Sequence, residues 1–312
     1  MAELMSLRKA YGDTLVELGK TDKDIVVLEA DLGMSTMGQL FQEPYPTRFF
    51  EMGISEANMA SVAAGLALTG KKAFMASFAV FSTGRCYDQI RTSICLPNVN
   101  VKICGSSAGF SDFGDGSTHQ SIEDIATMRA LPNMQVFSPV DAHQVESIVR
   151  YMAKTTGPMY IRINRNDLPV LTQKNKDFIP GKVYTVRDGR DAVVFASGVM
   201  VSLALEAAAI LEEESISLRV VNVPTIKPLD AEEVAGIAAD VKGVITAEEH
   251  SVIGGLGSAI SEALAPRIAK KVFYVGVEDT FGTSAQNYEV LLQHYNLTPQ
   301  HIAEKVRLSI KG

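Results

Sequence analysis

The chain has 312 residues, of which 46% are hydrophobic and 21% charged, and its formal net charge at pH 7 is −7. This length suffices for two domains that each bury a core, and the acidic balance offers no basic face for nucleic acid or anionic lipid. No apolar run reaches the roughly 18 residues of a membrane span, and the charged N-terminus does not suit a signal peptide. We therefore expect no nucleic-acid or membrane partner, a cytoplasmic location, and reduced, buried thiols at Cys86, Cys95 and Cys104.

The first part of the chain alternates segments typical of helices with segments typical of buried strands. Helical spacing of apolar residues is found at 6–20, 56–68 and 87–94, and apolar strand-like runs are found at 25–32, 72–81 and 98–107. This alternation is typical of a mostly parallel sheet with helices on both faces. It predicts a doubly wound α/β domain over residues 1–172.

A polar segment rich in Pro, Asn, Lys and Gly follows, and it predicts a linker at residues 173–189. Beyond it the α/β pattern restarts, with strand-like runs at 191–198, 217–230, 243–250 and 271–277 and helical runs at 201–214 and 254–265. Residues 190–312 are therefore predicted to form a second, smaller α/β domain. Its turn at residues 254–257, Gly-Gly-Leu-Gly, lacks the third glycine and the acidic residue of a dinucleotide site, so a plain strand-to-helix turn is favoured.

Three residues of the first domain are candidates for chemistry, although each has an ordinary structural interpretation. Glu56 lies in the first turn of a predicted helix, where an acidic residue is favoured by the helix dipole alone. Phe78 and Phe81 follow an apolar strand, and such aromatic pairs are commonly core residues. Their position near the carboxyl end of the sheet is also where ligands bind in open α/β folds.

Taken together, several stretches resemble the transketolase family of thiamine diphosphate enzymes. They occur in the family's order and cover the chain from Arg8 to about residue 280: FFEMGISEANM, SFAVFSTGRCYDQIR, GDGSTHQSIEDIATMRALPNMQVFSPVDAHQV, RINRNDLPVL and AEEHSVIGGLGSAISEAL. The resemblance implies a thiamine diphosphate pyrimidine-binding domain followed by a transketolase C-terminal-type domain.

The stretch GDGSTHQ at residues 114–120 decides which half of a transketolase the chain resembles. In this family the N-terminal half holds the metal and the diphosphate through a GDG followed at a distance by an asparagine. Here the next asparagine, Asn133, is too close, and Ser-Thr-His-Gln after the GDG is typical of the other half. The resemblance therefore implies the C-terminal section of a split enzyme, which needs an N-terminal-section partner. That partner would hold Mg²⁺ or Ca²⁺, while thiamine diphosphate is shared and no metal ligand comes from this chain.

The resemblance also assigns cofactor residues. Glu56 matches the glutamate that faces N1′ of the aminopyrimidine, and an apolar surrounding would favour its protonated form, because desolvation disfavours a carboxylate. Phe78 and Phe81 match the aromatic residues that flank the pyrimidine ring. Asp31 matches a position that supports the cofactor across the subunit interface.

Substrate residues follow from the same resemblance. Asp115 and His119 match residues that hydrogen-bond the sugar near the reacting carbons, and His119 is also assigned a catalytic role there. Arg8, Ser35 and Arg165 match positions that bind the sugar phosphate, which planar guanidinium groups hold with two hydrogen bonds. A second phosphate-site histidine of the family is replaced by Ser107, so the common pentose phosphates are not assured as substrates. We expect no catalytic role for the remaining histidines, His143, His250, His294 and His301.

The function implied is ketol transfer, in which a two-carbon unit moves from a ketose or its phosphate to an aldose or its phosphate, as in the pentose phosphate pathway. The alternatives are the β subunit of a 2-oxo acid dehydrogenase, a deoxyxylulose-phosphate synthase-like enzyme, and a non-catalytic structural or regulatory subunit. Alone, the chain is expected to form a homodimer through an apolar cofactor-facing surface, and with its partner an α2β2 heterotetramer.

Overall fold

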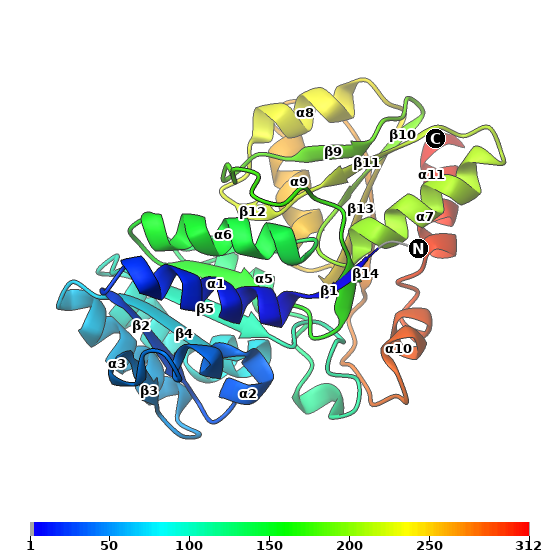
Figure 1. The fold of residues 1–312 in the computed structure, drawn as a ribbon. Helices are drawn as coiled ribbons and strands as arrows, with labels where there is room; N and C mark the ends of the chain where they lie inside the picture. The colour runs from blue at the N-terminus through cyan, green and yellow to red at the C-terminus, as the bar shows by residue number, and fades with distance from the viewer. Residues whose placement is uncertain (1–2, 312) are drawn as a thin grey trace.

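The computed structural model describes residues 3–311, which form two α/β parts built on largely parallel sheets (Figure 1). Within this range the first sheet has seven strands in the order β12-β6-β7-β5-β4-β2-β3, and only β12 is antiparallel to its neighbour. The strands are β2 (Ile25–Glu29), β3 (Phe49–Glu51), β4 (Lys72–Phe78), β5 (Val101–Ser106), β6 (Gln135–Phe137), β7 (Met159–Arg162) and β12 (Thr225–Lys227). The doubly wound prediction is confirmed for this part.

Helices cover both faces of the first sheet because successive side chains of its strands point to opposite sides. Along β4, Phe74 and Ala76 join one buried cluster, whereas Ala73 and Met75 join the other. One face carries α1 (Leu7–Thr21) and α6 (Ala142–Lys154), and the other carries α3 (Glu56–Leu68) and α5 (Asp124–Arg129). The helix predicted at 87–94 is irregular, since α4 (Tyr87–Gln89) lies between π-helical turns at η3 (Phe81–Arg85) and η4 (Ile90–Cys95).

Over the same described range the second sheet has five strands in the order β14-β13-β10-β11-β9, and β9 is antiparallel to β11. These strands are β9 (Tyr184–Arg187), β10 (Ala192–Ala196), β11 (Leu218–Asn222), β13 (Gly243–Ser251) and β14 (Val272–Val277). Its helices are α7 (Met200–Glu212), α8 (Ala231–Ala239), α9 (Leu256–Leu264), α10 (Tyr288–His294) and α11 (Pro299–Lys311). Strand β9 lies inside residues 173–189, the segment expected to be a linker.

Short elements complete the described chain. Strands β1 (Leu4–Ser6) and β8 (Asp167–Pro169) pair antiparallel, so residues 4–6 are hydrogen-bonded to the end of the first part. The loop after β2 holds a single helical turn, α2 (Gly33–Thr36), and three 3₁₀ turns are η1 (Gly38–Phe41), η2 (Pro46–Arg48) and η5 (Gly116–Thr118).

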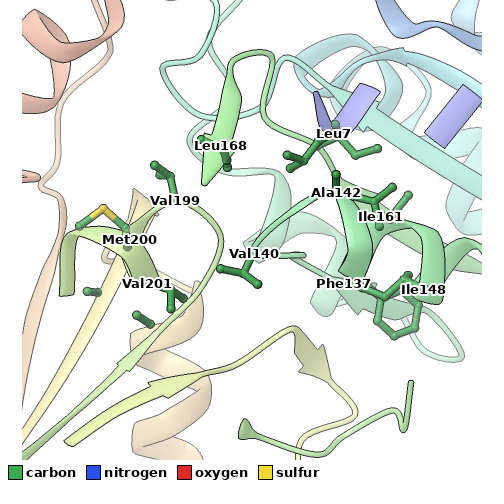
Figure 2. Packing of buried hydrophobic residues seen from close by; sticks show 14 of the residues in the cluster. Leu7, Phe137, Val140, Ala142, Ile148, Ile161, Leu168, Val199, Met200 and Val201 are labelled. Carbon is green, nitrogen blue, oxygen red and sulfur yellow. The ribbon is translucent and has the colours of Figure 1, made fainter. Parts of the chain in front are cut away.

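The two parts share one hydrophobic core rather than meeting as separate bodies. Figure 2 shows Val140 and Leu168 of the first part beside Val199 and Met200 of the second, and all four side chains belong to one buried cluster. Strand β12 adds a second link, because it follows β11 in the chain but pairs with β6 in the other sheet. The two parts are therefore fixed relative to one another by burial and by sheet hydrogen bonds.

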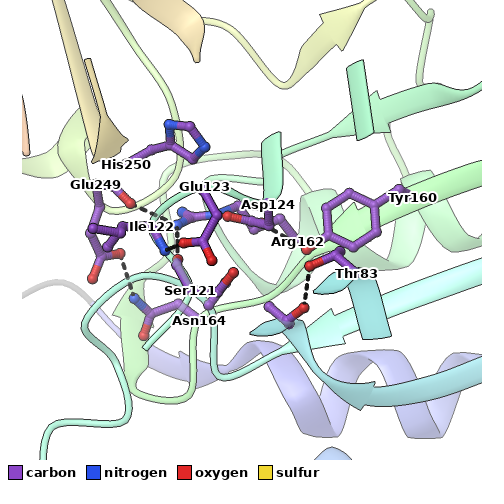
Figure 3. A network of polar contacts seen from close by, with 12 residues as sticks. Thr83, Ser121, Ile122, Glu123, Asp124, Tyr160, Arg162, Asn164, Glu249 and His250 are labelled. Atoms are coloured by element: carbon purple, nitrogen blue, oxygen red, sulfur yellow. Dashed lines mark hydrogen bonds and ion pairs between the residues drawn. The ribbon is translucent and has the colours of Figure 1, made fainter. Parts of the chain in front are cut away.

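A buried polar network joins the same two parts (Figure 3). Arg162 donates its Nε to both carboxylate oxygens of Asp124 at 3.1 and 2.9 Å, and its Nη2 to the carbonyl of Glu249 at 2.6 Å. The Glu249 carboxylate accepts hydrogen bonds from Asn164 Nδ2 at 3.3 Å and from the amide of Phe110 at 2.8 Å. Burial raises the pKa of Glu249 to about 7.

The turn at residues 254–257 is closed to an external phosphate. The amides of Leu256 and Gly257, at the start of α9, donate to the two carboxylate oxygens of Glu248 at 2.6 and 2.8 Å. An internal carboxylate thus occupies the place where an anion would bind a helix N-terminus. This contact agrees with the interpretation of the segment as a plain turn.

Candidate active site

The candidate site lies at the carboxyl edge of the first sheet, where the loops after its parallel strands meet. Asp31 follows β2, Glu56 follows β3, Phe81 follows β4 and His119 lies in the loop after β5. These four residues and Arg85 line one pocket of about 270 Å³. Four residues separated by as many as 88 positions in the sequence are therefore brought together by the parallel order of the strands.

Glu56 is the buried carboxyl group of this pocket. It begins α3, and only 4% of its surface is exposed. Its Oε1 accepts a hydrogen bond from Arg85 Nη1 at 3.0 Å, whereas the Arg85 side chain remains 51% exposed. The surroundings of Glu56 are therefore dry but not wholly apolar, since one guanidinium group reaches the carboxylate from the solvent side.

Aromatic rings form the wall beside Glu56. The rings of Phe78 and Phe81 are nearly parallel, with centroids 6.1 Å apart and an interplanar angle of 17°. The His119 ring meets Phe81 edge-on at 5.1 Å, and the Arg85 guanidinium lies 4.0 Å above the Phe81 ring. Phe81 is thus the central residue of this wall, because its ring contacts the His119 imidazole on one side and the Arg85 guanidinium on another.

A second group of predicted residues gathers around two arginines. Arg8 Nη1 donates to the carbonyl of Ser35 at 2.8 Å, and Arg165 Nη1 donates to Asp112 Oδ1 at 2.8 Å. Burial and the nearby Arg165 cation lower the pKa of Arg8. The structure therefore places Arg8, Ser35 and Arg165 together, with Asp112 as a carboxylate among them.

The two remaining predicted residues lie in the loop between β5 and α5. Ser107 is fully buried with a left-handed backbone (φ 53°), and its Oγ finds no hydrogen-bond partner within residues 3–311. Such a conformation is costly for a residue other than glycine and is common at functional sites. Asp115 is exposed at the tip of the loop and lies close enough to Asp112 to raise the pKa of that carboxyl.

Comparison with known proteins identifies the fold. Residues 3–170 match the family model of the transketolase pyrimidine-binding domain, and residues 181–302 match that of the transketolase C-terminal domain. The chain belongs to the transketolase family.

Individual relatives match over nearly the whole chain. A Methanocaldococcus jannaschii protein described as a transketolase C-terminal section is 42% identical, covering 98% of this chain and 96% of its own length. A subunit of 6-deoxy-6-sulfo-D-fructose transketolase from Clostridium sp. is 39% identical, covering 95% of this chain and 92% of its own. A solved structure named as an inactive β4 tetramer of a split-gene transketolase has a TM-score of 0.90 and 44% identity, covering 98% of this chain and 99% of its own.

The pocket fits the pyrimidine end of thiamine diphosphate, the cofactor that the transketolase family implies. A buried carboxyl group can share a proton with a ring nitrogen, and the flat wall of Phe78 and Phe81 suits a planar heterocycle. Within residues 3–311 no three acidic, histidine or cysteine side chains gather to hold a metal ion. No helix in this range is long and apolar enough to span a membrane.

Two residues of this transketolase site were not anticipated from the sequence. Arg85 pairs with Glu56, and Asp112 pairs with Arg165. Arg85 lies four residues after Phe81 on the same helical turn, and this spacing could have indicated that the two side chains lie on the same side of the turn. Asp112 lies in an irregular loop, where no periodicity indicates which way a side chain points. The three cysteines are buried and unpaired, as expected.

Proposed function

We propose that the chain is the C-terminal subunit of a two-subunit transketolase, which transfers a two-carbon ketol unit from a ketose or ketose phosphate to an aldose or aldose phosphate. The observation that carries this proposal is the convergence of Asp31, Glu56, Phe81 and His119 on one pocket. The relative described as a C-terminal section matches this chain end to end, which favours a partner that supplies the other half. Relatives are named for different sugars, including a sulfonated ketose, so the substrate is proposed only as a class.

Each residue of the pocket has a role that its position supports. Bound thiamine diphosphate would supply the carbon nucleophile that attacks the carbonyl group of the sugar. Glu56 holds a proton at the pyrimidine nitrogen, as a buried carboxyl group at that position can. Phe81 orients the pyrimidine ring, and His119 donates a hydrogen bond to the carbonyl oxygen of the sugar. Asp31 supports the cofactor from the β2 loop, and Asp115 contacts the sugar hydroxyls.

The surface beside the pocket favours association with a second subunit. Met34 and Ile54 are 77% and 73% exposed, and both lie in the loops that carry Asp31 and Glu56. Large apolar side chains at the edge of a site favour burial against another subunit. We therefore propose an α2β2 enzyme in which the partner covers this edge and holds Mg²⁺ or Ca²⁺ with the diphosphate. The chain alone would assemble with itself and be inactive.

The other candidate functions have less support. The relatives described above are named as transketolases, which favours ketol transfer over the 2-oxo acid dehydrogenase and deoxyxylulose-phosphate synthase alternatives. A purely structural or regulatory subunit would have no need for a buried glutamate beside an aromatic wall.

The test is reconstitution with the transketolase N-terminal-section subunit of the same organism, thiamine diphosphate and Mg²⁺. We expect ketol transfer by the pair and none by either subunit alone. Glu56→Gln, which keeps the shape but loses the proton, should reduce kcat at least about 100-fold. The control Glu17→Gln changes an exposed glutamate of α1 and should leave kcat unchanged. Full activity of Glu56→Gln, or of the isolated chain, contradicts the proposal.

A further inference from the structure

Asp112 is a carboxylate at the place where an anion was expected to bind. Its Oδ1 accepts from Arg165 Nη1 at 2.8 Å, and its side chain is only 3% exposed. Its other oxygen, Oδ2, is buried and has no hydrogen-bond partner within residues 3–311. A buried carboxylate oxygen without a donor is costly in the protein alone, and a ligand that donated a hydrogen bond to it would relieve this cost.

Several neighbouring polar atoms share this property. The Nε of Arg8, the Oγ of Ser107 and the Oε1 of Gln120 are also buried and unpartnered in the described range. Two of these atoms, the Oγ of Ser107 and the Oε1 of Gln120, can accept a hydrogen bond, as the hydroxyl groups of a sugar require. Such groups are seldom left unsatisfied. Ser107 and Gln120 lie in the same loop as Asp112, and the charge of Arg8 acts on that of Asp112, so these atoms favour a polar ligand at this end of the site.

Asp112 is linked to both ends of the site. It pairs with Arg165 of the arginine pair, and it lies in the same loop between β5 and α5 as Asp115 and His119, which belong to the reacting end. Burial raises the pKa of Asp112, the Arg165 cation opposes this rise, Asp115 adds to it, and His119 opposes it. Asp112 therefore interacts with charged groups of both ends.

The arginine pair does not present two free cations. Arg8 and Arg165 carry two positive charges, and the paired carboxylate of Asp112 removes one of them. A phosphate dianion bound beside Arg165 would face this carboxylate and be repelled by it, since like charges disfavour each other strongly where water is excluded. A sugar hydroxyl would instead donate to the unpartnered Oδ2.

We propose that Asp112 is a specificity-determining residue, which makes the enzyme favour substrates whose far end carries a hydroxyl or a single negative charge over those that carry a phosphate dianion. This inference rests on the proposed function, because it refines the substrate class of the same site. Ser107 acts in the same direction, since it stands where the transketolases that the sequence resembles have a phosphate-binding histidine.

The simplest alternative is that Asp112 only holds Arg165 in place. Its removal would then weaken the binding of every acceptor that Arg165 touches, whether phosphorylated or not. A specificity-determining carboxylate has the opposite signature, because its loss improves the phosphorylated acceptor and weakens the unphosphorylated one.

The first experiment uses the assembled two-subunit enzyme and compares D-ribose 5-phosphate with D-ribose as acceptor. Asp112→Asn keeps the shape and removes the charge, and it should raise the ratio of kcat/KM for the phosphorylated over the free sugar roughly tenfold or more. The control Asp13→Asn alters an exposed aspartate of α1 and should leave the ratio unchanged. An unchanged ratio, or equal losses on both acceptors, overturns the proposal.

The second experiment needs no activity. Inorganic phosphate binding to the isolated chain is measured at about pH 8, where the phosphate dianion predominates, by ³¹P NMR and by the shift of the melting temperature. Asp112→Asn should lower the phosphate Kd roughly tenfold, and so should Asp112→Ser if the first variant does not fold. An unchanged Kd overturns the role of Asp112. Absence of ketol transfer in the reconstituted enzyme, with the Kd lowered as expected, would instead refute the proposed function.

Discussion

Replacing Asp124 by Asn tests how much the buried network around Arg162 stabilises the fold. The change keeps the shape of the side chain but removes the carboxylate that pairs with the Arg162 guanidinium, which is 7% exposed, and leaves the Glu249 carboxylate as the nearby negative charge. Breaking a buried ion pair from one side costs about 3–5 kcal/mol. Arg162 keeps its bonds to the carbonyls of Ser121 at 3.3 Å and Glu249 at 2.6 Å, so we expect the lower end, about 3 kcal/mol.

The assay is urea unfolding followed by far-UV circular dichroism, with the midpoints compared at equal m-values. A matched control is Glu17→Gln, because Glu17 pairs with Arg150 at the surface and its side chain is 59% exposed. Exposed pairs contribute less than about 1 kcal/mol. If Asp124→Asn costs no more than this control, the buried network does not stabilise the fold and the reasoning is wrong.

Three further predictions follow from other contacts. Gly109→Ala should destabilise the fold more than Gly53→Ala in urea unfolding. Both glycines have positive φ (64° and 65°), but only a Cβ at Gly109 clashes with the Glu249 carboxyl group, and a Cβ at Gly53 meets nothing. Equal losses would contradict the clash. Burial lowers the pKa of Lys102 from 10.5 to about 7, so above pH 7 the unfolded chain binds more protons at this residue and the melting temperature should rise with pH between about 7 and 9. Above that range burial also raises the pKa of the three cysteines, which has the opposite effect on stability. Lys102→Met should abolish this rise. Phe81→Ala should weaken thiamine diphosphate binding to the assembled enzyme roughly tenfold, measured by titration, and unchanged affinity would exclude Phe81 from the ring site.

The fold was largely predictable because most segments carry a clear period. The helix predicted at residues 56–68 has the bounds of α3, and the alternation of helices and strands indicated parallel sheets. Residues 217–230 were predicted as one strand-like run, but they contain β11 and β12, which belong to different sheets. Apolar periodicity indicates that a strand is buried, but the partner of the strand depends on contacts that are distant in sequence.

The candidate site was predictable where its residues follow strands directly. Glu56, Phe81 and His119 converge because the carboxyl ends of parallel strands meet at one edge. The partners Arg85 and Asp112 were not predicted. The spacing of Arg85 from Phe81 offered a signal, whereas the pairing of Asp112 depends on the conformation of an irregular loop and not on a sequence period. The assignment of chemical roles came from resemblance to transketolases, since a lone acid at a helix start has an ordinary structural explanation.

The pairing of β12 with β6 has a consequence for how such a chain can evolve. Without β12, the amides and carbonyls along the outer edge of β6 would lie open, and another molecule could add a strand there. A fragment that ends before β12 is therefore expected to aggregate when expressed alone. A recombination event that replaced only the C-terminal domain would have to bring a strand of matching register for this edge. The two domains of this chain are accordingly expected to be inherited as one unit.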